Sequence, residues 1–312
     1  MPSKTRNSPS SNRNRPSVSI IGAGRLGSAL AVALENADYQ IDAVIARRLA
    51  KARQTSKLLD GETLPLDENQ LSRLPASDIN IISTPDDQIP VVAKRLADLG
   101  FTKGKRQVFL HTSGALSSAV LSPLSATGAS VGSLHPLIAV TEPKTGARAL
   151  RQAFWCIEGD RAAVKAARRI VKNLDGHSFS IEPDKKPLYH AAAVMVSGHM
   201  VALFDIAIGM LVKSGLSRKI AREILLPLIQ SNARNLAGVD TARALTGSFA
   251  RGDLATVERH LRAMADNGLK EETALYSILG SRSVELAKRV GTDRKALKRI
   301  KKLLQESQTH TK

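Results

Sequence analysis

The sequence predicts an α/β protein in which a doubly wound parallel sheet is followed by an all-helical domain. Two observations predict this architecture. Short β-branched runs alternate with helical stretches from residue 17 to about 182, and no strand-like run follows them. Strands that are buried on both faces and joined by helical crossovers form a parallel sheet. A chain of 312 residues is also long enough for two domains.

The expected elements follow in order along the chain. Helix-compatible segments such as 25–37 and 87–99 separate most of the strand-like runs. We expect strands at 17–22, 41–46, 78–84, 106–111, 129–134, 154–158 and 177–181. We expect helices at 187–214, 217–236, 253–266, 270–289 and 293–306, with Ser217, Asp253 and Thr292 as N-caps of the second, third and fifth.

The segment 187–214 is apolar along almost its whole length. It approaches the length that crosses a membrane, but its His190, His199 and Asp205 would be costly in lipid. A helix that is hydrophobic all round is typically buried. We therefore expect this helix to be buried at a domain or subunit interface, and we expect no membrane contact.

The domain boundaries follow from these patterns. We expect a disordered basic tail at 1–16, an α/β domain at 17–182, a helical domain at 183–306 and a tail at 307–312. The first segment is rich in Ser, Asn and Pro and has no apolar run that folding could bury. It lacks the apolar core of a secretory signal, and its prolines oppose the amphipathic helix of a transit peptide. We expect a cytoplasmic protein.

The net charge of +18 is concentrated at the two ends of the chain. Thirteen of the 46 basic residues lie in 1–16 and 288–312, which hold two acids. The last helix can lie on a phosphate backbone, or it can dock through Leu297, Ile300 and Leu304 with a solvated basic face. An aromatic content of 3% argues against stacking platforms for single-stranded nucleic acid. We expect no specific nucleic-acid partner.

A glycine-rich turn follows the first expected strand. The sequence Gly22-Ala23-Gly24-Arg25-Leu26-Gly27 comes directly after an apolar run and opens an Ala/Leu-rich helix. This context is typical of the Rossmann dinucleotide-binding motif, in which the glycines let a pyrophosphate approach the backbone and the helix N-terminus. The alternative is a strand–helix turn whose glycines serve packing alone.

The end of the second strand distinguishes NAD from NADP. An NAD enzyme usually carries an acid there, about twenty residues after the glycines, to bind the ribose hydroxyls. This chain has Arg47 and Arg48 instead, and the nearest acid, Asp42, lies at the start of the strand. A guanidinium binds a 2′-phosphate through two parallel hydrogen bonds. We expect NADP(H) in preference to NAD. The alternative is that Arg47 and Arg48 only form the exposed start of a helix.

Polar and small residues follow three further strands, at the edge where ligands bind in such sheets. They include Thr84 and Pro85, then His111 and Ser113, then His135. Each histidine can act as a general acid near neutral pH, or can cap a turn or bond a loop backbone. We interpret Asp86 and Asp87 as acids at a helix N-terminus.

The first long helix begins with a further candidate group. Tyr189 and His190 precede three alanines, which let a backbone or cofactor come close. His190 is either catalytic or buried and hydrogen-bonded. Lys186 is not favoured, because it lies at the helix start beside Lys185. We expect no metal, because three separated histidines without a carboxylate pattern are a weak metal signal, and a lone cysteine excludes a cysteine zinc finger.

These segments together resemble a known family. The stretches GAGRLGSALA, STPD, HTSGALSS, SLHPL, FWCIEGD, YHAAAV and LTGSFARGD occur in order over about 18–265. They resemble Rossmann-like proteins that carry a C-terminal domain of unknown function, number 2520 (DUF2520). These are similar to deazaflavin-dependent NADP oxidoreductases, pyrroline-5-carboxylate reductase, ketopantoate reductase and 6-phosphogluconate dehydrogenase. The resemblance implies a helical domain like the C-terminal domain of 6-phosphogluconate dehydrogenase, and a homodimer formed through it.

The resemblance and the motifs together favour an NADP(H)-dependent oxidoreductase. We expect hydride transfer between the nicotinamide and a small carbonyl or imine compound, with a 2-oxo acid as the first substrate by analogy. His190 or His135 would polarise or protonate the acceptor atom, with His111 and Ser113 as further catalytic candidates. The alternative is an NADP-binding sensor or scaffold without catalytic activity.

Overall fold

The computed structural model describes residues 15–101 and 107–309, and the chain divides into two compact units after Ser197. The expected boundary at 182 lies earlier, where the strands stop. The difference arises because the next helix, α7 (Lys186–Val196), belongs to the first unit, where its first residue is fully buried. Residues 1–14 and 310–312 of the expected tails lie outside the described residues.

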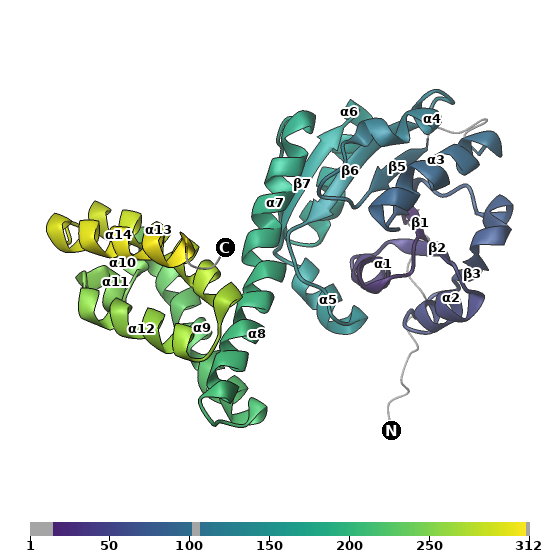
Figure 1. Ribbon diagram of the computed structural model, residues 1–312. Helices are drawn as coiled ribbons and strands as arrows, with labels where there is room; N and C mark the ends of the chain where they lie inside the picture. Colours follow the sequence, from purple (N-terminus) through teal and green to yellow (C-terminus); the bar gives the residue numbers. More distant parts are fainter. Residues whose placement is uncertain (1–14, 102–106, 310–312) are drawn as a thin grey trace, which may run out of the picture. The chain divides into compact units, whose positions relative to one another are not determined.

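An eight-stranded sheet runs through the first unit (Figure 1), in the order β3-β2-β1-β4-β5-β6-β7-β8. All neighbouring strands are parallel except β6 and β7. The strands are β1 (Ser17–Ile21), β2 (Gln40–Ala46), β3 (Leu64–Asp67), β4 (Ile79–Ile82), β5 (Val108–His111), β6 (Ser130–Pro136), β7 (Phe154–Gly159) and β8 (His177–Phe179).

The sheet departs from the prediction in two places. The β6–β7 pair is antiparallel because the intervening α5 (Pro143–Leu150) packs against α1 (Arg25–Glu35) and does not cross over the sheet between the two strands. The sequence also does not predict β3, whose LPLD stretch contains a proline. A proline is tolerated there because β3 is an edge strand. The expected strand at 106–111 begins at residue 106, which is outside the described residues.

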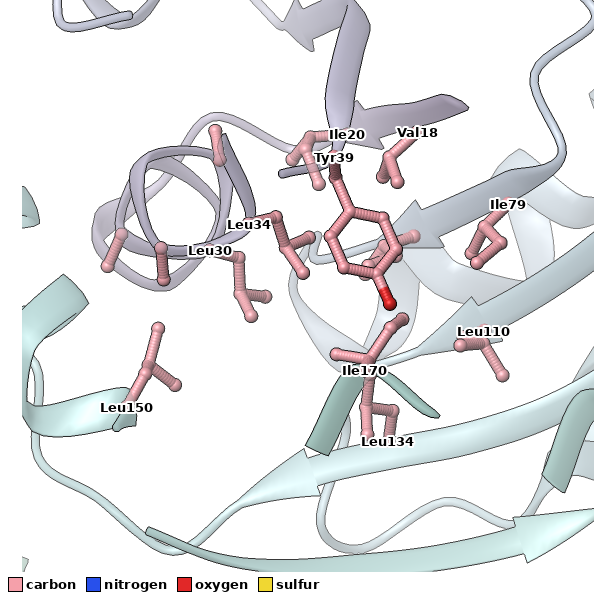
Figure 2. Close-up of a cluster of buried hydrophobic side chains, with 14 of the residues drawn as sticks. Val18, Ile20, Leu30, Leu34, Tyr39, Ile79, Leu110, Leu134, Leu150 and Ile170 are labelled. Atoms are coloured by element: carbon pink, nitrogen blue, oxygen red, sulfur yellow. The ribbon is translucent and has the colours of Figure 1, made fainter. Parts of the chain in front are cut away.

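Helices cover both faces of the sheet, as a doubly wound fold requires. Alternate residues of one strand point to opposite faces, so Ile20 and Ile21 belong to two different hydrophobic clusters. The first cluster (Figure 2) joins the sheet to α1, α5 and α6 (Arg161–Asn173). The second joins it to α3 (Ile89–Asp98) and α4 (Ser122–Ser125). α2 (Leu49–Ser56) follows β2.

The second unit is helical, as predicted. Its core is formed by α12, α13 and α14, and α14 docks through Leu297, Ile300 and Leu304. Ser217 and Asp253 cap their helices as predicted, but Asp293, and not Thr292, caps α14 by accepting from Ala296 N at 2.8 Å. The helices are α8 (Gly198–Lys213), α9 (Arg218–Gly238), α10 (Thr241–Ala244), α11 (Gly247–Arg251), α12 (Leu254–Asp266), α13 (Lys270–Arg289) and α14 (Arg294–Thr309).

The apolar segment that we expected as one buried helix is neither continuous nor, in the single chain, buried. Ser197, with φ −113° and ψ −85°, separates α7 from α8. Pro183–Lys213 is long and apolar enough to cross a membrane; its most apolar 18-residue window has a mean hydropathy of 1.8, and only 6% of that window is buried. In the single chain Val196 and Val201 are 74% and 64% exposed, so burial of this segment at a domain or subunit interface stays a prediction.

Candidate active site

The carboxyl ends of β1, β2 and β4 open onto a cavity of about 1040 Å³. The chain leaves β1 towards β2 on one side and reaches β4 on the other, so the cavity lies at the switch point where such folds bind ligands. Of the ten predicted cofactor-binding residues, seven line this cavity: Gly22, Ala23, Gly24, Arg47, Arg48, Thr84 and Pro85. The other three, Arg25, Leu26 and Gly27, form the first turn of α1.

The glycine-rich turn is held between two strands. The backbone N–H groups of Gly22 and Ala23 both donate to the carbonyl oxygen of Ile45 at 2.9 Å. Gly22 has φ +113°, and a Cβ there would lie 2.5 Å from the carbonyl oxygen of Ser83. A Cβ at Gly27 would lie 1.9 Å from the carbonyl oxygen of Gly22. Glycine is therefore required at both positions, for the turn and for the close approach of helix and strand.

The N-terminus of α1 supplies donors for an anion. The first hydrogen bond of the helix runs from Ser28 N to Gly24 O at 3.0 Å. The N–H groups of Arg25, Leu26 and Gly27 precede it and therefore have no acceptor within the helix. A Cβ built on Gly24 would meet no atom within 4 Å, so the backbone is open at this point. Free N–H groups and the helix dipole together suit a pyrophosphate.

Four basic side chains line the cavity, together with the acids Glu68 and Asp87. Arg47 and Arg48 are exposed at the end of β2, and Lys51 and Arg95 also line the cavity. Asp42 is not available to a ribose there, because it lies at the other end of β2, where it accepts from Ser77 Oγ at 2.6 Å.

Thr84, which follows the end of β4, contributes a buried polar atom to the cavity wall. Thr84 Oγ1 is buried and has no hydrogen-bond partner among the described residues. A buried hydroxyl without a partner is costly, and a ligand in the cavity can supply the missing bond. The donors, the cations and this hydroxyl fit a dinucleotide.

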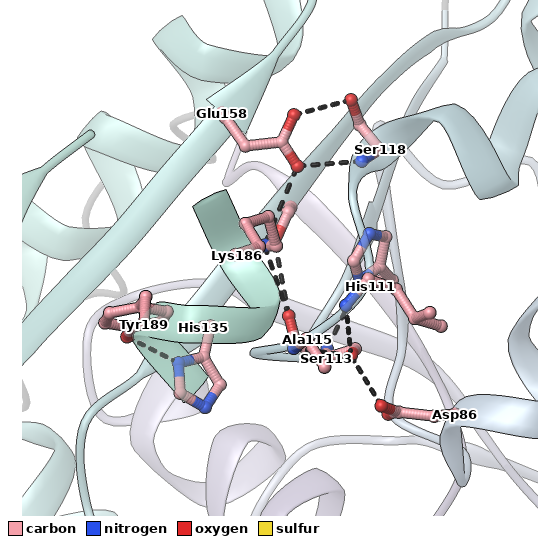
Figure 3. Close-up of polar contacts among 11 residues, drawn as sticks. Asp86, His111, Ser113, Ala115, Ser118, His135, Glu158, Lys186 and Tyr189 are labelled. Atoms are coloured by element: carbon pink, nitrogen blue, oxygen red, sulfur yellow. Dashed lines mark hydrogen bonds and ion pairs between the residues drawn. The ribbon is translucent and has the colours of Figure 1, made fainter. Parts of the chain in front are cut away.

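A second polar region lies at the ends of β5 and β6 and the start of α7 (Figure 3). His111 is fully buried, and its Nδ1 accepts from Ser113 N at 3.2 Å, which is the loop-backbone contact that we held as its alternative role. Ser113 Oγ donates to Asp86 Oδ2 at 2.8 Å. Asp86 opens the short helix that follows Pro85, so this bond ties the second region to the cavity wall.

Two imidazoles converge on the loop after β5. The rings of His135 and His190 are 5.6 Å apart and nearly perpendicular, at 83°. A Cβ at Gly114 would lie 2.7 Å from His135 Nε2 and 2.5 Å from His190 Nδ1, so only glycine lets both rings approach. His190 Nδ1 is buried without a hydrogen-bond partner among the described residues. His135 Nδ1 lies 2.7 Å from the Tyr189 hydroxyl.

A buried ion pair lies behind these rings. Lys186 is fully buried, with its Nζ 3.7 Å from Glu158 Oε1, 2.5 Å from Ser133 Oγ and 3.3 Å from Ser113 O. Glu158 in turn accepts from the backbone N and the hydroxyl of Ser118, both at 2.7 Å. The network thereby joins β6, β7, the loop after β5 and the first turn of α7.

The sequence did not single out these network residues. Lys186 looked like an ordinary charge at a helix start, and its burial depends on the strands that surround it. Glu158 gave a usable signal, because an acid within the apolar FWCIE strand needs a partner when it is buried. Among the described residues, no group of three His, Cys, Asp or Glu side chains could hold a metal ion.

Burial keeps the two strand-end histidines neutral. It lowers the pKa of His111 to about 3, and the Lys186 charge adds to the effect. It also lowers the pKa of His135 to about 4, with His190 and Lys186 acting in the same direction. Burial raises the pKa of the Tyr189 phenol. At neutral pH His135 therefore has one protonated and one free ring nitrogen.

These two pKa values predict that acid weakens the fold. Both histidines bind a proton below pH 6.5 in the unfolded chain but only below about 4 and about 3 in the folded one, so the free energy of unfolding falls as pH drops from 6.5 towards 4. Each contributes a slope of up to about 1.4 kcal/mol per pH unit. Denaturant titrations between pH 4 and 7 should show this slope. In His135→Asn the slope should be smaller, because the contribution of one histidine is missing. An unchanged slope in that variant would contradict the depressed pKa.

Comparison with known proteins agrees with the fold. Residues 2–136 match the Rossmann-like domain family, and residues 153–283 match the domain of unknown function DUF2520. No curated protein matches the chain in sequence.

Three solved structures are similar. A Thermotoga maritima protein has a TM-score of 0.69 at 23% identity, covering 87% of this chain and 99% of its own. A Bacteroides fragilis protein described as an NADP oxidoreductase has 0.66 at 23%, covering 85% and 96%. The Plasmodium falciparum pyrroline carboxylate reductase with NADP bound has 0.55 at 14%, covering 96% and 99%. The chain is thus a Rossmann-like protein with a C-terminal DUF2520 domain.

Proposed function

We propose that this protein is an NADP(H)-dependent oxidoreductase acting on a small carbonyl or imine compound. The observation that carries the proposal is the junction of two sites. One is a cavity of about 1040 Å³ lined by the glycine-rich turn and by Arg47 and Arg48, and the other is a pair of imidazoles tied to the cavity wall through Ser113 and Asp86. The descriptions of two similar structures, an NADP oxidoreductase and a pyrroline carboxylate reductase, support it.

The residues of the chain have separate tasks in this proposal. The N–H groups at the start of α1 bind the pyrophosphate, Arg47 and Arg48 bind the 2′-phosphate, and Thr84 supplies a hydroxyl to the bound cofactor. The nicotinamide supplies or accepts the hydride. His135 or His190 donates a hydrogen bond that polarises the acceptor oxygen or nitrogen of the substrate, and this atom takes up a proton from water after the hydride has been transferred. A 2-oxo acid, reduced to its 2-hydroxy acid, is the first substrate class and an imine the second.

The cofactor assignment predicts that NADPH binds more tightly than NADH. Saturation to about a hundred times Kd should stabilise the protein by about 2.7 kcal/mol, visible as a rise in Tm. Arg47→Asp should weaken NADPH about 10- to 100-fold, because a charge-assisted pair to the 2′-phosphate becomes a repulsion, and should affect NADH much less. Arg53→Asp, an exposed change on α2 away from the cavity lining, is the matched control. Equal loss in both variants would leave Arg47 without its assigned role.

The enzymatic assignment predicts NADPH oxidation in the presence of a substrate from a panel of 2-oxo acids and cyclic imines. Alanine in place of the histidine that acts on the acceptor atom (His135→Ala or His190→Ala) should lower kcat about 10²- to 10⁴-fold. NADPH binding should be retained in both variants. Absorbance at the nicotinamide band follows the reaction. If NADPH binds but is consumed with no member of the panel, the sensor alternative is favoured over the enzyme.

We also propose that a second copy of the chain covers the exposed apolar side chains of the helical unit. On α8 and α9, Val201, Ile224 and Leu228 are 64%, 52% and 58% exposed, and apolar patches of this kind mark interaction sites. Sedimentation should show a homodimer at micromolar concentration. Leu228→Glu should raise the dimer Kd at least about tenfold by burying a charge. Val290→Glu, at an exposed apolar residue just after α13, should leave the dimer Kd unchanged. A monomeric wild type would refute the proposal.

A further inference from the structure

His135 meets different surroundings with its two ring nitrogens (Figure 3). Nδ1 lies 2.7 Å from the Tyr189 hydroxyl, whereas Nε2 faces the bare Cα of Gly114. A neutral imidazole carries one proton, so one nitrogen donates and the other accepts. The tautomer therefore decides which nitrogen can donate a hydrogen bond to a bound molecule.

The Tyr189 hydroxyl selects one of the two tautomers. If Nδ1 carried the proton, it would donate to the phenol oxygen, and the half-buried phenol O–H would need another acceptor. The described residues offer Tyr189 no hydrogen bond other than the one to His135. If the phenol donates instead, its proton and the Nδ1 lone pair satisfy each other. A phenol is also a stronger acid than the N–H of a neutral imidazole, so it makes the stronger donor.

The surroundings keep both partners in the protonation states that this arrangement needs. His190 and Lys186 face His135 from α7, His111 lies near it on β5, and Cys156 is its cross-strand neighbour on β7. The nearby cation favours a neutral His135 ring, and burial keeps the proton on the phenol by raising its pKa. Tyr189 itself is held by an edge contact with Phe179, with ring centroids 5.9 Å apart.

We propose that Tyr189 is a positioning residue that holds His135 in the Nε2–H tautomer, so that the neutral ring donates a hydrogen bond from the nitrogen beside Gly114 and polarises the acceptor atom of a bound substrate. The identity of the hydrogen-bond acceptor rests on the proposed function. The tautomer does not, because it is a property of the protein without substrate. Tyr189 acts through His135 and does not itself contact the reacting atoms.

The chain contains a matched control pair in its helical unit. His260 Nδ1 lies 2.8 Å from the Tyr276 hydroxyl, and the two rings are perpendicular at 5.9 Å, against 5.6 Å and 89° for His135 and Tyr189. Tyr276→Phe removes the same kind of hydrogen bond from a different unit of the chain. Tyr189→Phe keeps the ring and its contact with Phe179 and removes only the hydroxyl.

The test is the nitrogen-15 spectrum of the histidine rings in the full-length labelled protein at pH 7, without nucleotide. His135→Gln assigns the His135 signals. The wild type should show the Nε2–H tautomer at His135, and Tyr189→Phe should shift the tautomer ratio towards Nδ1–H about fivefold, the value of one net hydrogen bond. Tyr276→Phe should leave these signals unchanged. A wild-type proton on Nδ1, or an unshifted ratio in Tyr189→Phe, would overturn the inference.

Turnover provides the second readout. With a substrate found in the NADPH assay, Tyr189→Phe should lower kcat by the same factor as the fraction of the Nε2–H tautomer falls in the nitrogen-15 spectrum, at most about fivefold, with little change in KM. A kcat that does not follow this fraction would overturn hydrogen-bond donation from Nε2. If the wild type turns over no substrate, the proposed function fails, and the nitrogen-15 spectrum alone decides the role of Tyr189.

Discussion

The arrangement of the candidate site depends on one buried interaction, the ion pair of Lys186 and Glu158. An ammonium that is fully removed from water is tolerated only when its partners compensate for the lost hydration. Lys186 finds them on Glu158, Ser133 and the carbonyl of Ser113, which come from β7, β6 and the loop after β5. Removing one partner of such a pair typically costs about 3–5 kcal/mol, because the other charge is left buried and unpaired.

The ion pair affects the imidazole pair because of where Lys186 lies in the chain. It is the first residue of α7, and Tyr189 and His190 lie on the next turn of the same helix. Anchoring the helix start therefore places the phenol against His135 and the second imidazole over Gly114. The same ammonium also helps to keep His135 neutral. One buried charge thus orients the imidazole pair and influences its protonation.

The cofactor cavity depends on a different constraint, the close approach of backbone to backbone. Gly22 lets the end of β1 approach the end of β4, and Gly27 lets α1 pack on the turn. These contacts leave the helix N-terminus facing the cavity. The bond between Ser113 and Asp86 connects this edge to the imidazole pair, so neighbouring strand ends bring the two regions together although they are far apart in sequence.

The sequence by itself determined most of the local structure and singled out most of the strand-end residues that line the cavity at β1, β2 and β4. The glycine spacing, the strand before it and Arg47 at the next strand end are short-range signals, and they reappear around one cavity. Only the tertiary structure decided the β6–β7 direction, the edge strand β3, the exposure of α8 and the burial of Lys186. Each of these depends on which distant segments pack together. A lysine at a helix start has the same local pattern whether solvent or a carboxylate surrounds it, so its role emerges only when the strands assemble around it.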